Sequence, residues 1–257
     1  VSRIVPAYQK HLIFEKIPSG TGSDEFELET INGKTVIRGN NFNSMAVGLN
    51  YYLKYYCLTS VSWYSDDPVE VPEIMPVVNE KIRKSARVKN RFFLNYCTFS
   101  YTMPWWKWKD WERCIDWMAL NGITMPLSIT GQEAVWYKVW RKLGLSDEQI
   151  RSYFTGPAYL PFHRMGIIDK WNGPLPWSWI NNPAELQKKI LARERELGMT
   201  PVLPAFSGHI PKSILTKFPD AKIKDVGQWG GFDIEYRGYF LDPMDPLFNK
   251  IQKEIGR

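Results

Sequence analysis

Two polar side chains follow a short buried run in the middle of the chain. Residues 92–94 are apolar, and Asn95 and Cys97 come directly after them, with Tyr101 further along the same loop. Loops after the strands of parallel sheets carry the reactive groups of many enzymes. An amide, a thiol and a phenol in such a loop would contact a bound ligand. The competing interpretation makes Asn95 a turn cap, Cys97 a small buried filler and Tyr101 a packing residue.

Glu133 is the carboxylate best placed for proton transfer. Gln132 and Glu133 follow a second apolar run, residues 123–127. Taken from the residues alone, Glu133 is the candidate general acid. The alternative is a glutamate in a helical first turn, where the helix dipole favours negative charge. His209 follows a third apolar run, residues 200–206, and is either a site group or a structural imidazole.

Aromatic residues are abundant, at 15% of the chain, and 12 of them are tryptophan. Large rings pack cores well, and an indole face also suits the apolar face of a sugar ring. Trp229 lies between glycines in a polar segment, as a stacking platform would. Phe162 lies in residues 155–182, a long stretch without clear periodicity, which in a compact domain is usually functional or disordered. Its aromatic content argues against disorder.

The elements that would position these side chains form a repeating pattern. The strand 92–94 is followed by a loop and then by a helix at 107–120, whose apolar residues recur every three or four positions. Asn121 and Gly122 would end this helix, because both tolerate the left-handed conformation. The strand 123–127 follows. This order of strand, helix and strand is a βαβ unit.

The whole pattern predicts an α/β fold with two domains. Residues 1–80 form a small α/β amino-terminal domain that includes a hairpin at Asn32–Gly33. Residues 81–257 supply three or four βα units of a (β/α)₈-type barrel. A complete barrel takes roughly 250 residues by itself. We therefore expect the barrel to be incomplete in this chain, with its remainder elsewhere in the same polypeptide or on another chain.

Charge and cysteine content give no support to several classes of protein. The net charge of +6 is spread along the chain without a nucleic-acid-binding motif. Three scattered cysteines indicate neither a disulfide framework nor a metal site, and no phosphate-binding glycine motif is present. No apolar run reaches the roughly 20 residues of a membrane span. Because the chain starts at Val1, removal of an export signal is compatible with the sequence.

Several long runs of residues resemble the amino-terminal part of the α-N-acetylglucosaminidases, glycoside hydrolase family 89. The runs with the least degeneracy are Asn95-Tyr96-Cys97-Thr98, Ile115-Asp116-Trp117-Met118-Ala119-Leu120-Asn121-Gly122-Ile123, Gly131-Gln132-Glu133-Ala134, Phe154-Thr155-Gly156-Pro157-Ala158 and Met199-Thr200-Pro201-Val202-Leu203-Pro204-Ala205-Phe206. The resemblance covers essentially the whole chain. It implies a small α/β domain, a (β/α)₈ barrel and then a helical domain.

The resemblance also implies a reaction, the exo-hydrolysis of terminal α-linked N-acetylglucosamine with retention. Retention needs two carboxyl groups roughly 5–5.5 Å apart. In the family both are glutamates on later strands, so we expect the catalytic pair beyond Arg257 and none in this chain. No metal or organic cofactor is implied. The implied partner is a glycan ending in that sugar. With the resemblance, Asn95, Cys97, Gln132 and Glu133 are expected to bind it, and Tyr101, Phe162, His209 and Trp229 are further substrate-binding candidates on their positions and chemistry.

Two alternatives come from other classes of protein. The chain could be a non-catalytic carbohydrate-binding protein that keeps the pocket loops without the acids. It could also be a truncated, inactive fragment. A third interpretation is a structural packing module that needs a partner chain to complete its barrel. Enzymes of this kind are usually exported, so we expect a secreted or periplasmic protein, or a lysosomal one in an animal.

Overall fold

The computed structural model describes residues 1–18, 20, 22–65 and 67–256. The chain divides into two compact units, the first made of Val1–Phe93, Trp108–Leu127 and Ile190–Val202 and the second of the remaining segments. Arg257 lies outside the described residues, as does any catalytic pair beyond it. A mixed α/β fold was predicted and is confirmed by the elements described below.

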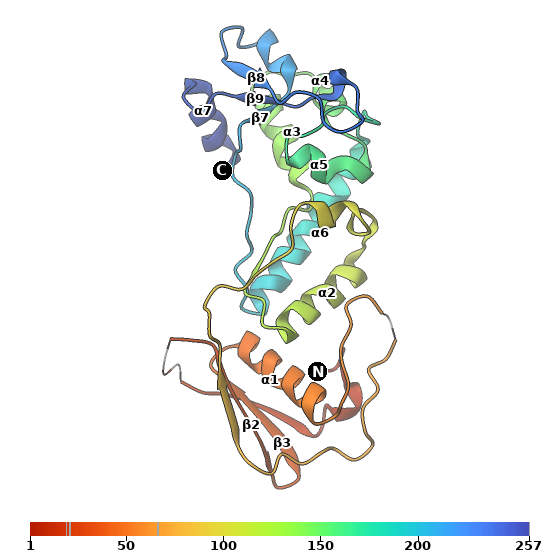
Figure 1. Cartoon of the computed structure of the whole chain (residues 1–257), viewed down its shortest axis with the longest axis vertical. Helices are drawn as coiled ribbons and strands as arrows, with labels where there is room; N and C mark the ends of the chain where they lie inside the picture. Colours follow the sequence, from red (N-terminus) through yellow and green to blue (C-terminus); the bar gives the residue numbers. More distant parts are fainter. Residues whose placement is uncertain (19, 21, 66, 257) are drawn as a thin grey trace. The chain divides into compact units, whose positions relative to one another are not determined.

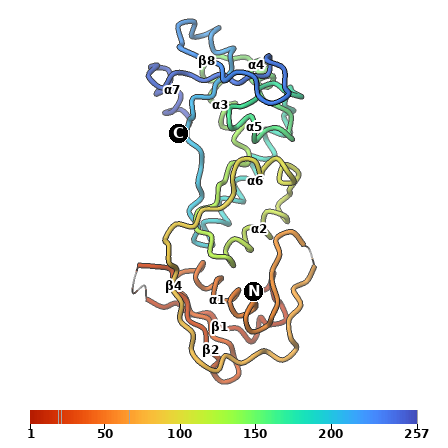
Figure 2. Tube along the Cα trace, viewed as in Figure 1, coloured from red at the N-terminus to blue at the C-terminus, as the bar shows by residue number. Residues whose placement is uncertain are grey.

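The first unit begins with a four-stranded sheet in the order β1–β3–β2–β4 (Figure 1). Its strands are β1 (Leu12–Lys16), β2 (Glu25–Ile31), β3 (Lys34–Gly39) and β4 (Ile82–Ser85). The predicted hairpin joins β2 to β3 at Asn32 and Gly33, whose φ angles are 49° and 74°. These left-handed angles match a two-residue hairpin turn. Figure 2 traces β4 in this sheet, where it pairs antiparallel with β2.

Helix α1 (Phe42–Tyr55) packs against β2 and β3. Its buried face includes Leu49, Tyr52 and Leu53, which join the apolar side of the sheet in one core. The first turn of this helix is capped by a side chain. The cap is Asn41, whose Oδ1 accepts a hydrogen bond of 2.8 Å from the N–H of Ser44. Asn41 takes this role because its backbone is extended while residue 42 already has helical geometry.

The predicted βαβ unit is present in the first unit. Strands β5 (Phe92–Phe93) and β6 (Met125–Pro126) pair in parallel, and helix α2 (Trp108–Leu120) connects them. The apolar stripe predicted for this helix is buried, with Trp111, Cys114, Ile115, Met118 and Ala119 at most 2% exposed. Gly122 closes the helix with φ of 74°.

The strand predicted at 200–206 is reduced to a single contact. Val202 forms one parallel bridge with Leu127, and the residues after it are irregular. Pro201 and Pro204 lack the N–H groups that a longer ladder would need. The order β5, β6 and Val202 nonetheless continues the parallel arrangement expected of a barrel.

Helices dominate the first part of the second unit. They are α3 (Gln132–Lys142), α4 (Asp147–Tyr153), α5 (Leu160–Arg164) and α6 (Trp177–Glu196), and α6 contributes residues to both units. Ser146 and Gln149 form a capping box at the start of α4. Pro183 lies inside helix α6.

A small antiparallel sheet completes the second unit. Its order is β7 (His209–Ile210), β9 (Tyr239–Leu241) and β8 (Ile223–Asp225), and helix α7 (Pro246–Ile255) follows (Figure 1). His209 was expected only to follow the strand at 200–206, but it lies in a strand itself, and β8 and β9 were not predicted. Buried side chains from all these helices and from the sheet form one core, which includes Trp136, Trp140, Tyr153 and Phe154. Among the described residues, no helix is long and apolar enough to cross a bilayer.

Candidate active site

Asn95, Cys97 and Tyr101 lie in one short segment of the second unit. Cys97 begins the 3₁₀ helix η2 (Cys97–Ser100), and Asn95 precedes it. The Oδ1 of Asn95 accepts a hydrogen bond of 3.2 Å from the N–H of Thr98, so the predicted turn cap exists. Its side chain is also exposed, as is that of Tyr101 at 69%, and Cys97 is a half-buried free thiol. A ligand could therefore reach all three residues.

Helix α5 packs against η2 and carries a further group of interest. Arg164, at its end, forms a bidentate ion pair with Glu133. The Nε and Nη2 atoms of Arg164 donate to the two carboxylate oxygens at 2.7 and 2.9 Å. Glu133 is completely buried in the first turn of α3, beside the half-buried Gln132. Both oxygens of this carboxylate are thus engaged by the guanidinium.

A cavity of about 380 Å³ lies on one side of α5. Its walls include Phe99, Met103, Leu160 and Trp179, so they are mainly apolar, with two charged groups, Lys107 and Arg164. None of the eight predicted site residues lines this cavity. Arg164 connects the cavity to the predicted site residues through its ion pair with Glu133.

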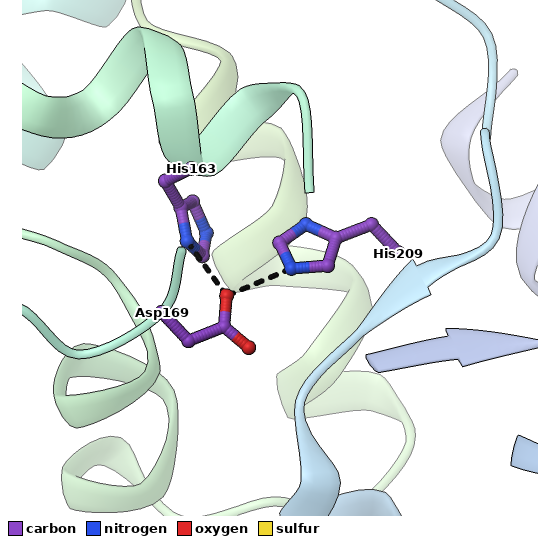
Figure 3. Close-up of side chains that lie close together, drawn as sticks. All are labelled: His163, Asp169 and His209. Atoms are coloured by element: carbon purple, nitrogen blue, oxygen red, sulfur yellow. Dashed lines mark hydrogen bonds and ion pairs between the residues drawn. The ribbon is translucent and has the colours of Figure 1, made fainter. Parts of the chain in front are cut away.

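His209 belongs to a fully buried polar network rather than to an open pocket. Its Nε2 lies 2.8 Å from Oδ1 of Asp169, and the same oxygen lies 3.1 Å from Nδ1 of His163 (Figure 3). The hydroxyl of Tyr153 lies 2.9 Å from Nδ1 of His209. These four side chains come from α4, α5, the turn after α5 and β7, and each is at most 4% exposed.

Burial sets the charge of this network. It lowers the pKa of His209 to about 3, and it also lowers the pKa of His163, although the hydrogen bond that His163 donates to Asp169 acts in the opposite direction. Both rings are therefore neutral at pH 7, with one N–H each. Burial raises the pKa of Asp169 to about 6, opposed by the bond from His163. At pH 7 Asp169 is ionised and accepts from both imidazoles, while the Tyr153 hydroxyl donates to His209.

Two imidazoles and a carboxylate are also ligand types that a divalent metal uses. The candidate ligand atoms of His163, Asp169 and His209 lie within 4.8 Å of one another. The contacts, however, are direct hydrogen bonds to one carboxylate oxygen, and they satisfy this oxygen and both N–H groups without an ion. Nε2 of His163 has no hydrogen-bond partner among the described residues. As it stands, the geometry is that of a hydrogen-bond network.

Phe162 and Trp229 meet although 67 positions separate them in the sequence. Their ring centroids are 5.2 Å apart, and Trp229 stacks on Phe232 at 5.5 Å with 16° between the planes. Further ring contacts extend this group, which we call the aromatic cluster, to Tyr159, Phe162, Trp171, Trp229, Phe232 and Tyr236. Trp229 is 37% exposed, so the cluster presents an indole to solvent.

Tyr153, His163, Asp169 and Arg164 were not predicted as members of the site. One signal was available in the sequence, since His163 and His209 are two of only three histidines in the chain. The pairing of these residues depends on contacts between positions 31 to 56 residues apart, which local patterns do not reveal.

Comparisons with known proteins agree on one group. Residues 91–256 match the family described as Alpha-N-acetylglucosaminidase (NAGLU) tim-barrel domain, and residues 1–77 match the corresponding N-terminal domain. A human protein named Alpha-N-acetylglucosaminidase is 42% identical over 213 residues, which are 82% of this chain and 28% of the human protein.

Two solved structures of a family 89 glycoside hydrolase from Clostridium perfringens are similar over 99% of this chain at 35% identity. One is a complex with 2-acetamido-1,2-dideoxynojirmycin, with a TM-score of 0.90. The other, with a TM-score of 0.91, has two glutamates replaced by glutamine and holds its substrate, GlcNAc-alpha-1,4-galactose. The chain spans only 29% of the length of either structure.

Proposed function

The chain belongs to the alpha-N-acetylglucosaminidase family, and on that premise we propose that the natural protein removes terminal α-linked N-acetylglucosamine from glycans. The observation that carries the proposal is the family match over residues 91–256, together with the similar fold of a relative bound to an α-linked N-acetylglucosamine disaccharide. The relatives are longer than this chain, so the activity is proposed for the natural protein as a whole.

The proposed reaction retains the configuration of the sugar. One carboxyl group acts as nucleophile and a second as acid and base, and we assign both to glutamates outside the present sequence. Glu133 is a poor candidate for either role, because Arg164 occupies both of its oxygens. The two carboxyl groups supply all the proton and nucleophile chemistry, so the proposal includes no metal or organic cofactor.

We assign sugar contact to the accessible residues of the site. The exposed indole of Trp229, backed by Phe162, would stack on the apolar face of the sugar. Asn95, Cys97 and Tyr101 would contact the sugar from the loop at η2, which packs against the helix that carries Phe162.

The buried candidates have a different proposed role. Glu133 and His209 are at most 1% exposed, so we propose that they shape the pocket from behind its surface. Gln132 is half-buried at the start of α3 and could reach the sugar through its amide.

The proposed partner is therefore a glycan, with the remainder of the same polypeptide completing the barrel. Because such glycans are found mainly outside the cytoplasm, we further propose that the protein is exported or, in an animal, lysosomal. Fractionation of the source cells, with detection by an antibody, tests this. Recovery of the protein with cytoplasmic markers would contradict it.

The direct test of the function is turnover of an aryl α-N-acetylglucosaminide by the purified natural protein, with its intact mass measured in parallel. We expect hydrolysis of the α-anomer and none of the β-anomer or of an aryl α-glucoside, which lacks the acetamido group. Binding of N-acetylglucosamine without any turnover, at a mass well above 30.0 kDa, would instead favour a carbohydrate-binding protein. Turnover by a protein of only that mass would contradict the placement of the acids outside this sequence.

A further inference from the structure

The aromatic cluster is assembled from two separate segments of the chain. Residues 159–171 supply Tyr159, Phe162 and Trp171, and residues 229–236 supply the other three rings. Neither segment is a long helix or strand, so regular secondary structure does not fix their relative position. Other contacts must hold Phe162 against Trp229.

Asp169 lies where these two segments meet. Its backbone N–H donates to the carbonyl of Tyr236 at 2.7 Å, and the preceding Ile168 bridges Arg237 in antiparallel pairing. Its carboxylate accepts from His163, the neighbour of Phe162 on α5, and from His209 on β7. One residue thus connects both halves of the cluster and the sheet beside them.

The surrounding packing leaves little room for adjustment. A Cβ atom on Gly238 would lie 2.0 Å from the carbonyl oxygen of Gly166, and one on Gly166 would lie 2.2 Å from the Phe240 ring. The backbones of the two segments therefore touch without an intervening side chain. A shift of either segment at Asp169 would be carried to the rings on both sides.

Stability alone does not explain why a carboxylate is buried here. Removing a charge from water costs several kcal/mol, and apolar residues of similar volume are often equally stable or better. Asp169 is 2% exposed and so cannot itself touch a sugar. Its hydrogen bonds to two imidazoles on different elements instead fix the orientation of those elements. An apolar side chain would not do this.

We infer that Asp169 is a positioning residue for the sugar platform. It holds Phe162 and Trp229 in one fixed arrangement, through His163 on the Phe162 side and through its backbone bond to Tyr236 on the Trp229 side, and His209 anchors its carboxylate to β7. The inference rests on the proposed function, because it assigns the platform to the sugar of that reaction. It adds a residue that has no contact with the sugar and yet determines how tightly the sugar binds.

The test compares three variants of the natural protein. Asp169→Leu keeps the approximate volume and removes both acceptors, while Asp169→Asn keeps one oxygen that can accept from both rings. Asp245→Asn is the matched control, because Asp245 is also buried and accepts N–H bonds from Leu247 and Lys222, but it does not contact the aromatic cluster. The measurements are KM and kcat on an aryl α-N-acetylglucosaminide, quenching of tryptophan fluorescence by N-acetylglucosamine, and the near-UV circular dichroism spectrum.

We expect Asp169→Leu to raise KM and the dissociation constant of N-acetylglucosamine at least tenfold, with a smaller effect on kcat. Its near-UV spectrum should lose the same band that Trp229→Phe removes. Asp169→Asn should stay within about threefold of the unmodified protein, and Asp245→Asn should lower the melting temperature without changing KM. Should Asp169→Leu fail to fold, His163→Phe removes one of the two donors and carries the same expectations.

Unchanged KM and an unchanged near-UV spectrum in folded Asp169→Leu would overturn the inference. Failure of the proposed function gives a different result. In that case the unmodified protein neither hydrolyses nor binds the sugar, while the near-UV comparison still decides whether Asp169 positions Trp229.

Discussion

The ion pair between Glu133 and Arg164 makes a strong prediction about stability. Removing one partner leaves the other as a buried charge without compensation, which typically costs about 3–5 kcal/mol. We expect Glu133→Ala to lower the free energy of unfolding by that amount. Glu185→Ala is the control, because Glu185 pairs with Lys188 on an exposed surface, where such pairs contribute about 0–1 kcal/mol. Urea denaturation of both variants measures the difference, and equal losses would contradict the importance of the buried pair.

His209 should make stability depend on pH in one direction. Its pKa is lowered to about 3 in the folded protein from the ordinary 6.5, so folding favours the neutral ring. The stabilisation from His209 is complete above pH 6.5 and is lost as the pH falls toward 3, at about 1.4 kcal/mol per pH unit. Asp169, whose pKa is raised to about 6, changes stability with pH in the opposite direction. This change occurs both in the unmodified protein and in a His209→Gln variant, so the difference between the two proteins reports on His209.

The measurement is the free energy of unfolding of both proteins at pH 7 and pH 5. We expect the advantage of the unmodified protein over His209→Gln to shrink by about 2 kcal/mol across this range. An advantage that stays constant would mean that His209 is not held neutral by burial.

The start of helix α3 depends on a glycine. Gly131 has φ of 71°, and a Cβ there would lie 2.7 Å from backbone atoms of Pro183 and Ala184 in α6. Gly227 has nearly the same φ, 75°, but open space around it. We expect Gly227→Ala to cost about 1 kcal/mol through backbone strain alone, and Gly131→Ala about 2–4 kcal/mol because the clash is added. Thermal unfolding of the two variants separates the cost of backbone strain from the cost of the clash. Equal losses of stability would contradict close packing of α3 on α6.

Local sequence patterns predicted the elements that local chemistry determines. The apolar spacing of α2 and the Asn32–Gly33 hairpin each lie within a short stretch of sequence, and both are present. Strands β8 and β9 have three residues each, too few for an alternating pattern to be recognised. His209 was not predicted in a strand because its pairing with Phe240 comes from 31 residues away.

The same difference between local patterns and long-range contacts explains which parts of the candidate site could be predicted. The positions of Asn95, Cys97 and Glu133 after apolar runs were visible in the sequence, whereas the partner of Glu133 was not. Arg164 is 31 residues away on α5 and was not considered. Asp169 likewise acquires its importance from contacts with His209 and Tyr236, which only the folded chain brings together. The roles of the eight site residues in sugar binding stay predictions.

The molecule as a whole should bind its sugar through the aromatic cluster. Trp229→Ala should weaken binding of N-acetylglucosamine at least tenfold, since loss of one stacking face costs roughly 1.4 kcal/mol. Trp177→Ala is the control, because Trp177 has a similar exposure, 41% against 37%, and contacts Tyr137 and Arg151 instead of the cluster. Fluorescence titration measures both, and equal affinities of the two variants would contradict the assigned platform.

The stereochemistry of hydrolysis tests the account most directly. Proton NMR of an aryl α-N-acetylglucosaminide, recorded during the first minutes of turnover by the natural protein, identifies the anomer that is released before mutarotation. A retaining mechanism with two carboxyl groups predicts α-N-acetylglucosamine as the first product. Release of the β-anomer first, or no release of the sugar by the intact protein, would contradict the account.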